Sequence, residues 1–222
     1  MSALVEICVD SVDGVRIADE AGAARVELCA GLIEGGTTPS IGTVRTVLAG
    51  PFTTGVLVMI RPRGGDFCYS ASEVAVMLAD IAAVRAVAAE LGTPVGFVFG
   101  ALTADGAVDV TTTGRLVRAC GDAPVTFHKA FDVTADLGRA LDDLIRLGVR
   151  RVLTSGGAPR AVDGIAALAD LVRQAGSRII VIAGGSVRPD NVADIVARTG
   201  VPEVHLRATS GDVVREVLAC VG

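Results

Sequence analysis

The chain has 222 residues, of which 51% are apolar, and a formal net charge of −5 with a pI of about 5.0. This length suits one large domain or two small ones, and the acidic balance argues against a nucleic-acid-binding surface. The first residues lack a basic start and carry Glu6 within their apolar run, so they do not resemble a signal peptide. No segment reaches ~20 uncharged apolar residues, and five cysteines do not suggest a disulfide framework. We therefore expect a cytoplasmic protein with reduced thiols that binds neither membranes nor nucleic acid.

Strand-like and helix-like segments alternate along the whole sequence. Short β-branched runs predict eight strands, at residues 4–9, 24–29, 55–60, 94–100, 124–129, 150–155, 179–185 and 203–208. A helical pattern follows each run, for example at 12–22, 71–92, 135–148 and 189–200. Several of these helical segments reach a glycine that suits a left-handed C-terminal cap, namely Gly22, Gly92, Gly148 and Gly200.

Eight βα units without a linker predict an α/β fold, a (β/α)₈ TIM barrel that forms a single domain over residues 1–222. The nearly all-apolar strands fit a parallel sheet that is covered on both faces. A doubly wound open sheet is the alternative, but the first connection, residues 10–14, lacks its glycine-rich phosphate motif. In a barrel, functional residues gather at the carboxyl ends of the strands.

The first two strands carry the same pattern, a glutamate followed two residues later by a cysteine. Side chains alternate along a strand, so Glu6 and Cys8 share one face, as do Glu27 and Cys29. The aliphatic residues between them suit the layer against the helices, which directs both pairs into the barrel. Two thiolates on neighbouring strands suit Cu(I), in which case their sulfurs should lie under about 5 Å apart with roughly linear coordination. Two inert buried thiols are the alternative.

Both histidines of the chain, His128 and His205, fall near the carboxyl ends of predicted strands. We expect them to meet Glu6, Glu27 and a cation, with Arg61 as the partner of the buried carboxylates. Such a set can shift pKa values and move a proton, which makes the two glutamates, the two histidines and Asp132 beside His128 candidate acid–base residues. Histidines that only form hydrogen bonds in the core are the alternative.

The strand ends at positions five to seven suggest an anion site. His128 is followed by Lys129 and Asp132, the sixth strand ends in a segment that holds Ser155, and the seventh ends at Gly184 and Gly185. Glycine turns in this part of a barrel often bind phosphate through backbone N–H groups. Tight turns without a ligand are the alternative.

The loop at residues 60–70, IRPRGGDFCYS, is unusually rich in reactive side chains. Arg61 and Arg63 are expected at the barrel mouth, where arginine can bind an oxyanion in a planar fork, and Asp66 is expected to pair with an arginine. An arginine–aspartate brace without a ligand is the alternative.

Five segments resemble the copper homeostasis protein CutC family: VELCAGLIEGGTTPSIG, RPRGGDFCYS, VTFHKAFD, RVLTSGG and EVH. The resemblance extends from residue 4 to about residue 206. It implies a (β/α)₈ barrel, often dimeric, that handles copper in the cytosol. It also implies Cu(I) binding by Cys8 and Cys29, and a polar mouth formed by Glu6, Glu27, Arg61, Arg63, Asp66, His128, Asp132 and His205.

Three functions are consistent with these features. In the first, the chain binds Cu(I) through Cys8 and Cys29 as a homodimeric copper homeostasis protein. Alternatively, it is a TIM-barrel enzyme that acts on a small anionic substrate, phosphorylated or sugar-like, with a glutamate or histidine moving the proton and Arg61 holding the anion. In the third, its polar interior is purely structural.

Overall fold

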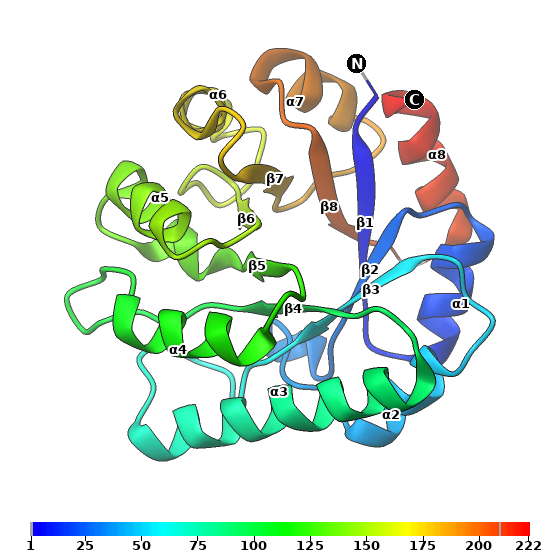
Figure 1. Ribbon diagram of the computed structural model, residues 1–222. Helices are drawn as coiled ribbons and strands as arrows, with labels where there is room; N and C mark the ends of the chain where they lie inside the picture. The colour runs from blue at the N-terminus through cyan, green and yellow to red at the C-terminus, as the bar shows by residue number, and fades with distance from the viewer. Residues whose placement is uncertain (1, 209) are drawn as a thin grey trace.

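The computed structural model describes residues 2–208 and 210–222, and eight parallel strands close into a barrel in sequential order with β1 beside β8 (Figure 1). The strands are β1 (Leu4–Val9), β2 (Arg25–Leu28), β3 (Gly55–Met59), β4 (Gly96–Phe99), β5 (Val125–Phe127), β6 (Arg151–Thr154), β7 (Ile180–Gly184) and β8 (Glu203–Arg207). The predicted single-domain (β/α)₈ barrel is confirmed.

Helices surround the strands as an outer ring (Figure 1). They are α1 (Val12–Glu20), α2 (Ile41–Leu48), α3 (Ala71–Leu91), α4 (Val110–Cys120), α5 (Leu137–Arg146), α6 (Ile165–Ala175), α7 (Val192–Thr199) and α8 (Gly211–Val221). Two short 3₁₀ helices, η1 (Leu32–Glu34) and η2 (Lys129–Val133), follow β2 and β5. Within the described ranges, no helix is both long and apolar enough to cross a membrane.

Local sequence signals set the helix ends. The Ser70 side chain accepts from the Glu73 N–H while Glu73 accepts from the Ser70 N–H, which forms a capping box at the start of α3. The predicted cap residues Gly22, Gly92, Gly148 and Gly200 all have positive φ angles, as a left-handed helix end requires.

Several strand and helix boundaries differ from the sequence prediction, and two of the differences have a local cause. The fifth strand ends at Phe127 because His128 turns the chain: its Nδ1 accepts from the Ala130 N–H at 3.2 Å and opens η2. The helix predicted at residues 189–200 begins at Val192, because the Asn191 side chain accepts from the Arg188 N–H at 2.9 Å and holds a turn there.

Alternating side chains divide the core into two parts. The large part lies between strands and helices and is built from aliphatic and aromatic residues such as Val5, Ile7 and Phe97. The smaller part lies inside the barrel and consists of Cys8, Cys29, Leu57, Met59 and Val98. The predicted inward direction of the two cysteines is therefore confirmed.

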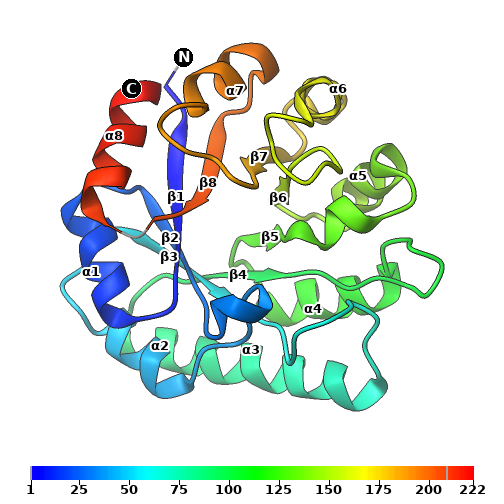
Figure 2. The same ribbon diagram turned by 180° about the vertical axis from the view of Figure 1, so that it is seen from behind.

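The loops after the strands gather at one end of the barrel. Figure 2 shows this end, with the blue segment around η1 lying in front of the strands. Parallel strands all direct their carboxyl ends here, so residues from β1, β5 and β8 can meet across the barrel axis.

Candidate functional site

A layer of buried charges lies inside the barrel, toward the amino ends of the strands. Glu6 has no exposed surface and accepts a hydrogen bond from Arg25 Nε on the neighbouring strand. Arg25 also donates to Glu203, which accepts from Arg151 Nε at 3.2 Å. We call Glu6, Arg25, Arg151 and Glu203 the buried ion network. Two carboxylates balance two guanidinium groups, as burial of ionised side chains requires.

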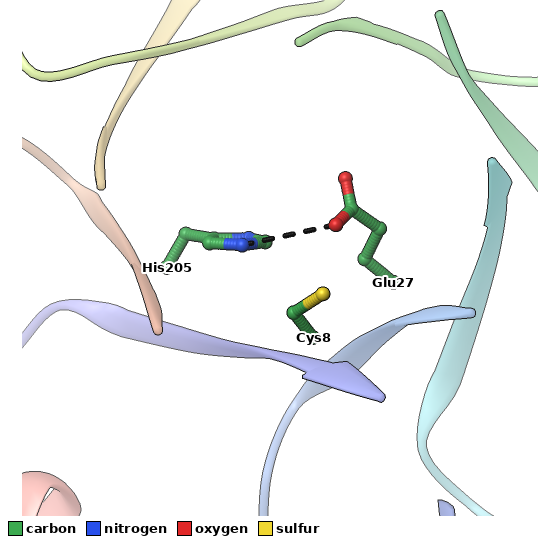
Figure 3. A group of neighbouring side chains, drawn as sticks. All are labelled: Cys8, Glu27 and His205. Atoms are coloured by element: carbon green, nitrogen blue, oxygen red, sulfur yellow. Dashed lines mark ion pairs between the residues drawn. The ribbon is translucent and has the colours of Figure 1, made fainter. Parts of the chain in front are cut away.

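Two residues further along the strands lies a thiol–histidine cluster, formed by Cys8, Cys29, Glu27 and His205. The sulfurs of Cys8 and Cys29 are 3.9 Å apart, which satisfies the expected separation. His205 Nε2 lies 3.8 Å from Glu27 Oε2. Figure 3 shows Cys8, Glu27 and His205 converging on one point, and their potential ligand atoms all lie within 4.8 Å of one another.

Glu6 fixes the orientation of the His205 ring. Its Nδ1 lies 2.7 Å from Glu6 Oε1, and a carboxylate at that distance makes Nδ1 the donor. Nε2 is thereby left facing Cys8 and Glu27. Metal-binding histidines are commonly held in this way, with a carboxylate on the ring nitrogen that does not touch the metal.

Burial and neighbouring charges shift the pKa values of the cluster in opposite directions. Burial alone would raise the pKa of Glu6, but hydrogen bonds and charges from His205 and Arg25 lower it to about 2. A hydrogen bond from Cys29 lowers the pKa of Cys8 to about 5, against the effect of burial and with help from His205. Burial raises the pKa of Glu27 well above its usual value. Cys8 therefore favours the thiolate form, which is the form that binds metals.

Arg61 does not pair with Glu6 or Glu27, so the expected ion pair is wrong. Its guanidinium donates to three backbone carbonyls, of Glu34 at 2.9 Å, Gly36 at 3.0 Å and Gly65 at 2.8 Å. This long side chain reaches away from the axis and ties η1 to the β3–α3 loop, while Arg25 takes the place beside Glu6.

Arg63 is directed away from the barrel mouth. It forms ion pairs with Asp66, at 3.0 Å, and with Glu73 of α3. The predicted pairing of Asp66 with an arginine is confirmed, but the loop works largely as a brace. The loop contributes Arg61 and Phe67 to the cavity lining, and the Phe67 ring centroid lies 4.9 Å from the Arg61 guanidinium and 5.0 Å from the His128 ring centroid.

The segment after β5 holds a positioned lysine. Lys129 Nζ donates to Asp132 and to Ser155 Oγ, each at 2.7 Å. Asp132 also accepts from the backbone N–H groups of Ser155 and Gly157, at 3.0 and 2.9 Å. Asp132 and Ser155 therefore fix the position of the Lys129 ammonium group.

A cavity of about 500 Å³ opens at this end of the barrel. Of the residues predicted for the site, the following line it: Cys8, Glu27, Arg61, His128, Gly185 and His205. The other predicted residues are absent from its lining: Glu6, Cys29, Arg63, Asp66, Asp132, Ser155 and Gly184. Glu6, Cys29, Asp132 and Ser155 contact residues that line it.

Five residues that matter here were not selected from the sequence, namely Arg25, Arg151, Arg188, Glu203 and Arg207. Arg25 shares its strand face with Glu27 by the same alternation that placed the glutamates, so the signal was present. Arg188 lines the cavity from the loop after β7, and Arg207 lines it from the end of β8. Neither arginine belongs to a distinctive motif.

The sequence model of the CutC family matches residues 3–210. A family protein CutC of Mesorhizobium japonicum is 52% identical over 205 residues, covering 92% of this chain and 77% of the relative. The copper homeostasis protein cutC homolog of Mus musculus is 46% identical, covering 93% of this chain and 74% of the relative.

Solved structures agree with the sequence comparison. A CutC protein from Streptococcus agalactiae superposes with a TM-score of 0.83 at 35% identity, covering 92% of this chain and 98% of the other. N-(5'-phosphoribosyl)anthranilate isomerase from Pyrococcus furiosus has a TM-score of 0.60 at 12% identity, covering 99% of this chain and 98% of the other. At that identity it shows only the shared barrel fold.

Proposed function

Because this chain belongs to the CutC family, we propose that it serves copper homeostasis by binding Cu(I) through Cys8, Cys29 and His205. The observation that carries the proposal is the Glu6–His205 contact at 2.7 Å, which leaves His205 Nε2 facing Cys8, and the Cys8 sulfur in turn lies 3.9 Å from the Cys29 sulfur. Soft thiolates select Cu(I), and imidazole is a common copper ligand.

The spacing of the sulfurs favours three ligands over two. With metal–sulfur bonds of about 2.3 Å, sulfurs 3.9 Å apart subtend an angle of roughly 116° at the metal. This angle is closer to trigonal than to the roughly linear coordination expected from sequence. A third ligand completes a trigonal site, and His205 Nε2 is the imidazole donor of the cluster. Against the effect of burial, the charge of Glu27 and hydrogen bonds to Cys8 and Glu6 raise the pKa of His205 well above its usual value, so Cu(I) has to displace the Nε2 proton.

Glu27 distinguishes Cu(I) from Zn²⁺ at this site. Its carboxylate lies beside Cys29 and His205, at 3.6 and 3.8 Å, and an oxygen ligand suits Zn²⁺ better than Cu(I). Replacing Glu27 with glutamine should leave Cu(I) affinity nearly unchanged while weakening Zn²⁺ binding. Equal losses for both metals would contradict the assignment of Cu(I) to the two thiols and the histidine.

The decisive measurement is Cu(I) binding under reducing conditions, in competition with a chromophoric Cu(I) chelator. The C8S/C29S variant should lose the site. The matched control is C68S/C220S, which removes the two exposed thiols and should bind as the wild type does. Retained Cu(I) binding in C8S/C29S would place the metal elsewhere and end the proposal.

The relatives' names favour copper homeostasis over the alternative of an acid–base enzyme. The proposal includes a cytoplasmic location, where thiols stay reduced, and a homodimer, as the family resemblance implies. Light scattering during size-exclusion chromatography tests the dimer, and a monomeric mass at micromolar concentration would remove that part.

A further inference from the structure

The cavity is far larger than a metal ion requires, and cationic side chains line it as well as Cys8. Its lining includes Lys129 after β5, Arg188 after β7 and Arg207 at the end of β8. Neither Arg188 nor Arg207 forms an ion pair with any residue that the structure describes. A volume of about 500 Å³ falls within the range of small-molecule sites.

His128 lines this cavity, and its buried ring holds a hydrogen-bond donor without a partner among the described residues. The ring is 4% exposed, and its Nδ1 accepts from the Ala130 N–H at 3.2 Å. A neutral imidazole whose Nδ1 accepts must carry its proton on Nε2. Burial lowers the pKa of His128 to about 3, with a smaller contribution from the charge of Arg61, so the neutral form prevails. Its Nε2 has no partner among the described residues, which leaves a buried N–H donor unsatisfied.

Lys129 supplies a second donor close by. An ammonium group has three N–H donors, and Asp132 and Ser155 accept two of them. Lys129 is the only lysine in a sequence that otherwise uses arginine for its cations. The compact ammonium suits its place, because a Cβ added at Gly185 would lie only 3.2 Å from Nζ.

We propose that the cationic side of the cavity, formed by His128, Lys129, Arg188 and Arg207, binds the phosphate or carboxylate group of a small organic anion. Donors from an imidazole and an ammonium group, together with two guanidinium groups, match the acceptors of an oxyanion. The rest of such a molecule would lie against Leu32, Met59 and Phe67, the apolar part of the same lining. This site uses none of the three residues that we assign to Cu(I), so it stands independently of the copper proposal.

The test uses the full chain labelled with ¹⁵N-histidine, titrated separately with inorganic phosphate and with acetate. With two histidines in the sequence, a His128→Gln variant assigns both signals. We expect a saturable shift of the His128 Nε2–H signal, in the wild type and equally in C8S/C29S. A larger response to phosphate would identify a phosphate ligand, and a larger response to acetate a carboxylate.

Variants locate the anion. Lys129→Met should weaken binding by about tenfold or more, since a charge-assisted hydrogen bond is lost, while Lys129→Arg keeps the charge and should lose less. The control is Arg45→Gln, because Arg45 pairs with Glu90 on the outer helices and should not alter binding. Absence of a saturable His128 shift with either anion, or equal weakening by Lys129→Met and Arg45→Gln, would overturn the proposal.

Discussion

Replacing Arg25 with methionine removes the cation that links Glu6 and Glu203 while keeping most of the side-chain volume. The side chains of all three residues are at most 8% exposed, so neither carboxylate gains water in exchange. Glu6 keeps His205 at 2.7 Å and Glu203 keeps Arg151 at 3.2 Å, so each carboxylate retains one partner. Removing one partner of a buried ion pair costs about 3–5 kcal/mol, and we expect a loss in that range.

Urea unfolding, extrapolated to water, measures this loss directly. The matched control is Arg45→Met, which breaks an ion pair of 2.7 Å whose side chains are 47% and 57% exposed. Exposed pairs contribute little to stability, so the control should lose much less than Arg25→Met does. We also expect the double variant R25M/E6Q to cost less than the sum of its single variants, because the two groups interact. An equal loss for Arg25→Met and Arg45→Met, or strict additivity, would show that the buried ion network is not desolvated.

Three further predictions address separate parts of the molecule. Glu6→Gln replaces the carboxylate that orients His205 with an amide. It should lower Cu(I) affinity by about 10- to 100-fold in the chelator assay, and unchanged affinity would mean that His205 is not a ligand. The folded-state pKa of His128, about 3, lies below its ordinary value of 6.5, so the unfolded chain binds more protons between these values. The free energy of unfolding should therefore fall as pH drops below about 6.5, by up to about 1.4 kcal/mol per pH unit from this residue, and urea titrations should show a shallower fall in His128→Phe. Gly42→Ala, within α2 and with its nearest neighbour at 3.7 Å, should raise stability by about 0.4–1 kcal/mol, whereas Gly164→Ala places a Cβ 1.9 Å from the Ser155 carbonyl oxygen and should lower it. Thermal melts that rank these two variants the other way would refute the packing argument.

Much of the fold was predictable because alternation and glycine positions are local signals. The period of two along a strand placed Glu6, Cys8, Glu27 and Cys29 inside the barrel, and the structure agrees. The number of strand–helix units was sufficient to predict the barrel. These features depend on near neighbours in the sequence, which a single sequence displays in full.

The partners of the buried charges were not predictable, because they depend on the stagger between strands. In the barrel Glu6 lies opposite Arg25, and Cys8 lies opposite Glu27. A shift of two residues would have paired the glutamates with each other and left the inward faces unchanged. The direction of the Arg61 side chain could not be predicted either, because its acceptors are backbone carbonyls of a loop whose path leaves no pattern in the sequence.

The pairing of β1 with β8 has a consequence for synthesis of the chain. The contacts that complete the site join residues 199 positions apart, in the case of Glu6 and His205, and 178 positions apart, in the case of Arg25 and Glu203. Until the last strand leaves the ribosome, β1 and β7 are open edges whose unpaired backbone groups can recruit other strands. Glu6 and Arg25 also lack their distant partners during that interval. A nascent chain therefore carries Cys8 and Cys29 but lacks His205, so the proposed three-ligand Cu(I) site and protection from aggregation would be completed together, at the end of translation.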